Sequence, residues 1–204
     1  MLNIEEREQN PMKIIGLCKE KIKNILMLDD DIVQLVMPNL DDSNFSFEQN
    51  WFGCKITDNI NGNKEARYLI GHCKDTPYFD ETIKDQRVMI CMESYINRFK
   101  PSYMDISVNI NVVCHKDMMD IPESDLAYWK SKGYAGNRVD MICMAIYNAL
   151  TQPEVVNNFG IGKMNLDYYS PQLQSFKPNF YFYGRSMNFK IDEIFLSQSV
   201  GNVK

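Results

Sequence analysis

The sequence lacks any apolar run close to the roughly 18 residues that a membrane-spanning helix needs, so we expect no membrane segment. Its first residues, Met1 to Glu8, are acidic and lack the basic and then apolar order of a signal peptide. We therefore expect the protein to be made and kept in a cytoplasm.

Positive charge is also scarce. The 22 Lys and Arg residues are outnumbered by 27 Asp and Glu residues, which gives a net charge of −5 and a pI of about 5.1. A stable nucleic-acid binder needs a basic footprint, so this composition argues against that class. It remains compatible with DNA that passes an acidic lining without being held by it.

Metal-ligand spacing is absent as well. Side chains of zinc-ligand type occur at His72-Cys73, Cys91 and Cys114-His115, but the sequence has no CxxC or HxxxH spacing, which is what makes such clusters specific. The six cysteines are scattered, and Cys18, Cys114 and Cys143 fall on apolar faces, where a reduced cysteine behaves as a small hydrophobe. We expect no structural metal, no cofactor and no disulfide.

No complete catalytic motif is present. His72 and His115 have no Ser or Cys nucleophile in a recognisable elbow nearby. The segment 160–163 (Gly-Ile-Gly-Lys) resembles part of a phosphate loop, but Met164 follows the lysine, so a turn is the better interpretation. We therefore assign no catalytic residue.

Acidic residues that could hold a divalent ion have simpler explanations. The run Asp29-Asp30-Asp31 directly precedes an apolar-periodic segment, which indicates a helix cap. A metal-dependent nuclease needs Asp and then Glu-x-Lys on adjacent strands. Glu93 is the nearest candidate, but Tyr95 stands in place of that lysine.

The clearest pattern that is present lies between residues 103 and 150. Apolar side chains alternate with polar ones through residues 106–115, which predicts a strand with one buried face. Residues 138–150 have helical spacing of apolar side chains, with Asn137 and Asp140 as a cap pair. We predict an α+β fold in which this helix crosses a mostly antiparallel sheet.

The flanking segments extend this plan. Asn10-Pro11 predicts the start of an N-terminal helix, and a second short helix should run from Asp29 until Pro38 stops it. Further elements are expected as follows: short strands or a packed loop within 39–64, a turn at 61–63, strands at 66–70 and 88–96, a loop over 71–86, and a short helix at 124–130 in the connection 117–136.

Near the C-terminus, residues 180–191 predict a β-hairpin around a two-residue Gly184-Arg185 turn. In that register Phe182 faces Met187 and Phe180 faces Phe189, which puts the large apolar residues on one face and Tyr181 on the other. We interpret the whole chain, 1–204, as a single domain with an N-terminal arm, 1–9, and a C-terminal tail, 196–204.

The order of these elements resembles that of the tail-terminator and related neck proteins of tailed bacteriophages: an N-terminal helix, paired strands 88–96 and 103–115, a long loop, the helix 138–150, and the hairpin 180–191. The resemblance covers about residues 10–195 and rests on element order. It implies a non-enzymatic structural protein of the virion neck, in a ring usually of six subunits that joins or caps the tail tube. It also implies other neck and tail proteins as partners, with DNA only as passing cargo in the lumen.

Two surfaces suit that role. Interfaces favour aromatic and Arg anchors, so we predict subunit contacts at Tyr128, Trp129, Tyr134, Tyr181, Tyr183 and Arg185. The polar row Ser107, Asn109, Asn111 and His115 suits a wet lumen or a neighbouring subunit. Two alternatives stay open: a small phage-type nuclease or hydrolase with an unrecognised site, and a monomeric adaptor with one protein partner.

Overall fold

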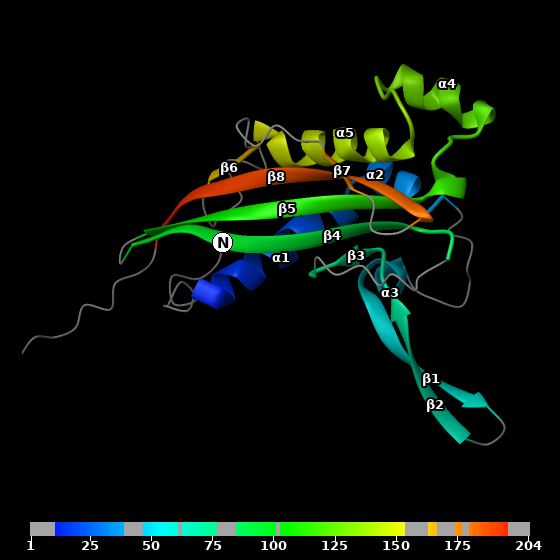
Figure 1. Cartoon of the computed structure of the whole chain (residues 1–204), viewed down its shortest axis with the longest axis horizontal. Coiled ribbons are helices and arrows are strands. Elements are labelled where there is room, and N and C mark those ends of the chain that lie inside the picture. The colour runs from blue at the N-terminus through cyan, green and yellow to red at the C-terminus, as the bar shows by residue number, and fades with distance from the viewer. Residues whose placement is uncertain are drawn as a thin grey trace, which may run out of the picture.

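The computed structural model describes residues 11–38, 47–60, 63–76, 85–100, 103–153, 163–166, 174–176 and 180–195. These form a six-stranded sheet with helices laid against one face, and a separate two-stranded ribbon that projects from the body (Figure 1). The fold is α+β with a mostly antiparallel sheet, as the sequence predicts. Among the described helices, none is long and apolar enough to cross a bilayer.

Three helices cover the sheet where the periodicity predicts them: α1 (Pro11–Met27), α2 (Asp30–Val36) and α5 (Arg138–Thr151). Asp29 caps α2, because its carboxylate accepts a hydrogen bond from the Ile32 N–H at 3.0 Å. Asn137 and Asp140 form a reciprocal capping box at the start of α5. The predicted caps of both helices are therefore confirmed.

The sheet has the strand order β3-β4-β5-β8-β6, and β7 pairs with the same free edge of β8 as β6 does. Among the described strand pairs of this sheet, β3–β4 is parallel and the others are antiparallel. The long hairpin predicted from residues 88–96 and 103–115 is confirmed, and it is longer than expected. The strands are β3 (Cys73–Lys74), β4 (Val88–Lys100), β5 (Tyr103–His115), β6 (Lys163–Leu166), β7 (Gln174–Phe176) and β8 (Phe182–Phe195).

The main core lies between the helices and one face of the sheet. Alternate residues of β5, from Met104 to Cys114, are fully buried there. They meet the apolar stripes of α1 and α5, including Cys18, Ile22 and Ile142. A smaller cluster on the second face consists of Met89, Cys91, Val113 and Phe182, with Tyr181 packed against it.

The predicted C-terminal hairpin is wrong. Residues 182–195 form one uninterrupted strand, β8, which pairs with β5 along most of its length. Gly184 makes no turn. It lies opposite Val113, where an added Cβ would come within 2.2 Å of the Val112 carbonyl oxygen. The glycine is needed for this close approach of two strands, a long-range constraint that the local sequence cannot show.

Loss of the hairpin also changes the predicted faces. Phe182 lies in the second-face cluster, whereas Met187 and Phe189 lie in the main core. Phe180 is 87% exposed, so the prediction that it shares a buried face with Phe189 is wrong.

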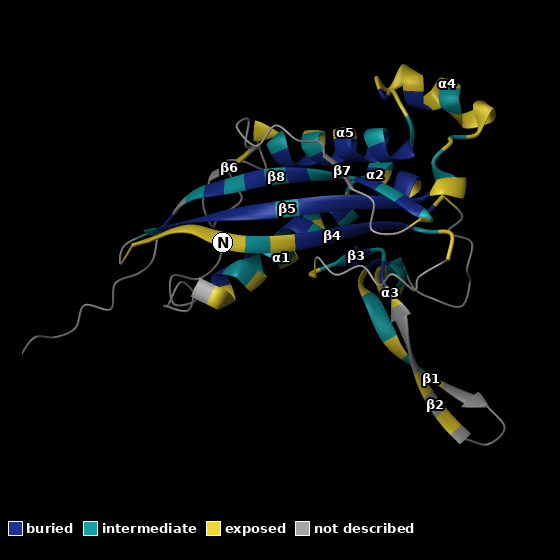
Figure 2. Cartoon of the chain, in the orientation of Figure 1, coloured by how far each residue is buried: buried dark blue, intermediate teal, exposed yellow. Residues whose placement is uncertain are grey.

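Residues 47–70 form a short helix, α3 (Phe47–Phe52), and then an antiparallel ribbon of β1 (Gly53–Ile60) and β2 (Asn63–Ile70). The strand expected at 66–70 is therefore confirmed. Ile60 pairs with Asn63; of the turn predicted at 61–63, residues 61 and 62 lie outside the described residues, and Asn63 begins β2. The buried Trp51 anchors α3 in the main core, whereas the ribbon beyond it lies away from the sheet (Figure 2).

The connection between β5 and α5 contains a 3-10 turn at Lys116–Met118 and the helix α4 (Glu123–Ser131). The helix predicted at 124–130 is confirmed, and Gly133, with φ of 86°, follows its end. The helix cap expected at Asn10, the turn at 160–162, the arm 1–9 and the tail 196–204 lie outside the described residues.

Candidate assembly surfaces

The predicted polar row lies on the sheet face opposite the main core. Three of its four members are nonetheless buried within one chain, with exposed fractions of 1% for Ser107, 6% for Asn111 and 4% for His115, and Asn109 is half-buried. Ser186 Oγ donates to Asn109 Oδ1 at 2.6 Å, which joins β8 to β5. Because these side chains are already enclosed, they are not available to line a wet lumen, and that part of the prediction is wrong.

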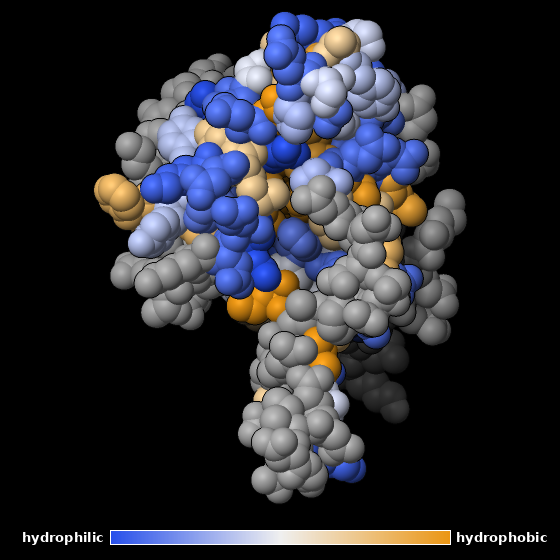
Figure 3. All heavy atoms as spheres, turned by 90° about the vertical axis from the view of Figure 1, so that its right-hand side faces the viewer, coloured by the Kyte–Doolittle hydropathy of each residue, from blue (hydrophilic) through white to orange (hydrophobic). Residues whose placement is uncertain are grey.

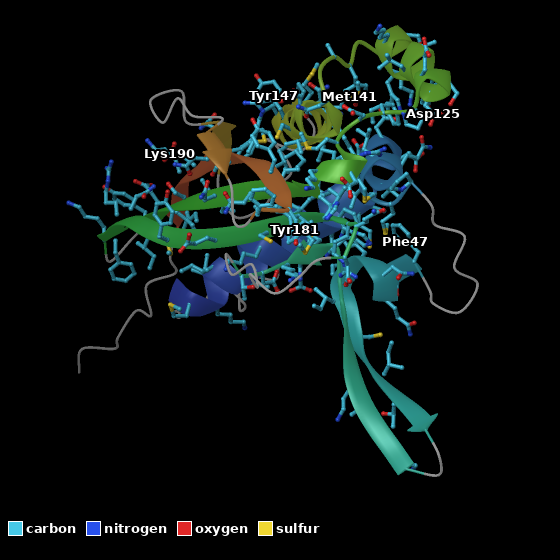
Figure 4. The ribbon with its side chains drawn as sticks, turned by 45° about the vertical axis from the view of Figure 1, so that its right-hand side comes forward. Phe47, Asp125, Met141, Tyr147, Tyr181 and Lys190 are labelled. Atoms are coloured by element: carbon cyan, nitrogen blue, oxygen red, sulfur yellow. The ribbon has the colours of Figure 1, made fainter. Side chains whose placement is uncertain are left out.

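The aromatic end of β5 is more accessible. The buried His115 ring stacks on Tyr181, with centroids 6.1 Å apart, and meets the edge of Phe182 at 5.2 Å. The Lys116 ammonium lies 5.2 Å from the exposed Phe180 ring and 5.4 Å from the Tyr181 ring. The half-buried Tyr181 (labelled in Figure 4) therefore lies between the buried His115 and the exposed pair of Lys116 and Phe180.

Three of the predicted anchors gather around α4, which stands away from the sheet and carries Asp125 (Figure 4). The Trp129 ring meets Tyr134 edge-on at 5.6 Å, and both are buried inside the subunit. Tyr134 donates its hydroxyl to Asp31 at 2.9 Å, and Lys132 pairs with the same carboxylate. Burial, followed by the bond to Asp31, raises the pKa of Tyr134 to about 12.

We call the contacts of Tyr134 and Lys132 with Asp31, together with the Trp129 ring packed on Tyr134, the α4 latch. They show that Trp129 packs within its own subunit. The ring already has its partners inside one chain, so it holds α4 in place. Tyr128, with 45% of its surface exposed, is the member of the aromatic group that a neighbouring protein can reach.

The remaining predicted anchors lie on β8. Tyr183 pairs with Cys114 on β5 and is half-buried. Arg185 Nε donates to the Asp140 carboxylate, the group that also caps α5. Arg185 thus ties β8 to the start of α5, a contact between residues far apart in the sequence. Of the six predicted interface residues, three thus lie at or just after α4, and three lie at the start of β8 or directly before it.

The candidate zinc ligands have other partners. His72 Nδ1 lies 2.7 Å from the Val88 carbonyl oxygen, and burial lowers the pKa of its ring. Burial raises the pKa of Cys91 to about 11 and that of Cys114 to about 12. In the part of the chain that the structure describes, no three metal-ligand side chains come together.

The ribbon β1–β2 contains none of the predicted interface residues. Its root is fixed: Gly53 has φ of 82°, and a Cβ on Gly71 would come within 2.3 Å of the Phe52 backbone. Beyond that root, none of the described strands pairs with either edge of the ribbon. Two views at right angles show it projecting from the body (Figures 1 and 3).

A family model described as YomW matches residues 29–191. The chain belongs to the YomW family. This is a phage-derived family, named for a gene of an SPbeta-like prophage, so the protein is phage-associated. No curated protein and no solved structure matches the chain.

The YomW match begins at Asp29, the cap of α2, and ends at Ile191 within β8. It therefore takes in the ribbon, α4 and the paired strands β4 and β5, and it leaves α1 outside. The ribbon is thus part of the YomW unit. The match supports the phage origin expected from the element order and says nothing of a position within a virion.

Proposed function

We propose that this YomW-family chain is a structural subunit of a phage neck. In this proposal it forms a closed ring, of about six copies if it follows the resemblance stated above, that terminates the tail or joins it to the head connector. Other neck and tail proteins are its partners, and DNA passes through without being bound. Assembly is its activity, and it has no catalytic residues.

The projecting ribbon is the observation that carries this proposal. A two-stranded ribbon alone is marginally stable in water and needs further strands or a packed helix. Here α3 lies at the root, and the described residues supply no third strand along β1 or β2. A neighbouring protein would supply the missing contacts. In a ring, each copy gives this ribbon to one neighbour and receives another in return.

The charge of the chain fits the same role. A net charge of −5 disfavours retention of phosphates, which suits a passage through which DNA moves.

The adaptor alternative rests on the same ribbon, since a single protein partner could also cover it. Oligomeric state separates the two, because an adaptor stays monomeric until its partner is added. An enzyme of the nuclease type would instead cleave plasmid DNA in the presence of Mg²⁺ or Mn²⁺, and we expect no cleavage.

The test compares the wild-type chain with a ribbonless variant. Cys54 and Leu69 are paired neighbours, so residues 55–68 can be replaced by Asn-Gly to close a short hairpin. Mass photometry and negative-stain microscopy should show rings for the wild type and monomers for the variant, while circular dichroism shows both folded. A wild-type protein that stays monomeric at high concentration and with its neck partners would disprove the ring.

A further inference from the structure

Among the described residues, no strand pairs with the outer edge of β4 over more than half of its length. β3 pairs with β4 only at Ile90 and Cys91, and no other described strand continues along Met92–Lys100. Every residue from Tyr95 to Lys100 is exposed. An edge strand of this kind presents unpaired N–H and C=O groups that can accept another strand.

The direction of the backbone groups on this edge follows from one hydrogen bond. The Ile90 N–H donates to the His72 carbonyl at 2.7 Å, across the outer edge. Backbone groups alternate in direction along a strand, so the N–H groups of Met92, Ser94 and Ile96 point to the same outer edge. The register of β4 against β5 is regular up to Ile96 and shifts only after it.

The exposed side chains of this stretch include three large apolar ones among polar and charged neighbours. Tyr95 is 44% exposed, Ile96 37% and Phe99 56%. Natural edge strands are generally protected by charges, bulges or covering segments. Arg98, paired with Asp105, lies among them, so the edge combines open backbone groups with aromatic and aliphatic surface.

We propose that the ribbon β1–β2 of one copy pairs with the outer edge of β4, at Met92–Lys100, of a second copy. The inference rests on the proposed function and names the contact that builds the ring. β1 and β2 have 8 residues each, similar to the open stretch of β4. The added pairing gives the ribbon its third strand and removes the open edge in one step.

The positions of the two parts favour a second copy over pairing within the chain. The ribbon leaves the body beside α3, whereas the exposed half of β4 reaches the opposite end of the sheet (Figures 1 and 2). A donor at one end and an acceptor at the other make a head-to-tail contact, which closes into a ring when the rotation between copies allows.

Two variants test this contact. Ile96→Pro removes an outward N–H and puts a proline ring on the open edge, while the β4–β5 hydrogen bonds remain. Ile96→Ala is the matched control, because it loses the side chain and keeps the N–H. Ile96→Lys is a second acceptor variant for use if the proline chain fails to fold. The donor variant is the ribbonless chain described above.

We expect Ile96→Pro and the ribbonless chain to be folded monomers by circular dichroism and native mass spectrometry, and Ile96→Ala to assemble. Mixed together, the two monomers should form a 1:1 heterodimer and nothing larger. One chain then supplies only the ribbon and the other only the edge.

Other outcomes distinguish the two proposals. If the wild type forms rings but the mixed variants form no heterodimer, the ring stands and the ribbon-to-edge contact is wrong. If Ile96→Pro lowers the melting temperature of the ribbonless monomer, a segment of the same chain occupies the edge, and this proposal is again wrong. A wild type that never assembles would overturn both.

Discussion

Single residues in this protein are often constrained by strands that are distant in the sequence. Gly184 is the clearest case, because the atoms that leave no room for a side chain there belong to the backbone of β5. The Gly-Arg dipeptide is compatible with a hairpin turn, and nothing local distinguishes that turn from a close strand approach. The same limit applies to Arg185, whose partner Asp140 could be predicted only as a helix cap.

Gly184→Ala should therefore lower the free energy of unfolding by about 1–3 kcal/mol, the usual range for overpacking in a filled site. Gly16→Ala is the matched control, because nothing lies within 4 Å of its added Cβ on the exposed side of α1. Alanine there should be neutral or stabilise the helix by about 0.5–1 kcal/mol. Urea denaturation of both variants measures the difference, and equal midpoints would show that β8 does not approach β5 this closely.

Elements with a strong local period were predictable, and those fixed by neighbouring elements were not. The helices α1, α2 and α5 and the strands β4 and β5 each bury a regular stripe, so spacing alone located them. β8 was not located because its apolar residues change face along the strand: Phe182 lies in the second-face cluster, and Met187 and Phe189 lie in the main core. The turn signal at 61–63 does not predict the projection of the ribbon from the body, which depends on tertiary packing at Trp51 and Gly71.

The continuity of β8 can be tested with two phenylalanines. Phe182 is buried among Met89, Cys91 and Val113, so Phe182→Ala should cost about 3–5 kcal/mol of stability. Phe180→Ala, at a position that is 87% exposed, should change stability by no more than about 0.5 kcal/mol. A hairpin would bury both rings, so comparable losses in a denaturant melt would favour the hairpin.

The latch at α4 gives a second element-scale prediction. Trp129→Ala and Asp31→Ala each remove a contact that holds α4, so trypsin should cut faster after Lys130 and Lys132 in either variant. Glu123→Gln, at an exposed position in the first turn of the same helix, is the control and should be cut at the wild-type rate. An unchanged cleavage rate in Trp129→Ala would mean that Trp129 does not hold α4, and would favour its predicted role as a subunit-interface residue.

On the scale of the whole molecule, buried thiols link folding to pH. Burial raises the pKa of Cys18, Cys114 and Cys143 to about 12 and that of Cys91 to about 11, and it also raises the pKa of Cys73. In the unfolded chain a thiol loses its proton near pH 8.5. The unfolded state therefore binds fewer protons above that pH, and stability falls as the pH rises.

We expect the buried thiols to leave the free energy of unfolding unchanged below about pH 8.5. Between there and about pH 11 they should make it decline. Urea midpoints at pH 7.5 and 10 measure the decline. Cys143→Ala should make this decline shallower, because it removes one of the buried thiols with a raised pKa. A decline of the same size in Cys143→Ala would assign the effect to other groups.

The central position of β5 has a consequence for exchange of backbone hydrogens with deuterated solvent. β5 pairs with β4 on one edge and β8 on the other, and both of its faces are largely buried. Its amides should exchange only when the whole domain opens, so their rate reports global stability. The amides on the outer edges of β1, β2 and β4 should exchange quickly in a lone subunit and slowly in an assembled one, which makes assembly visible strand by strand.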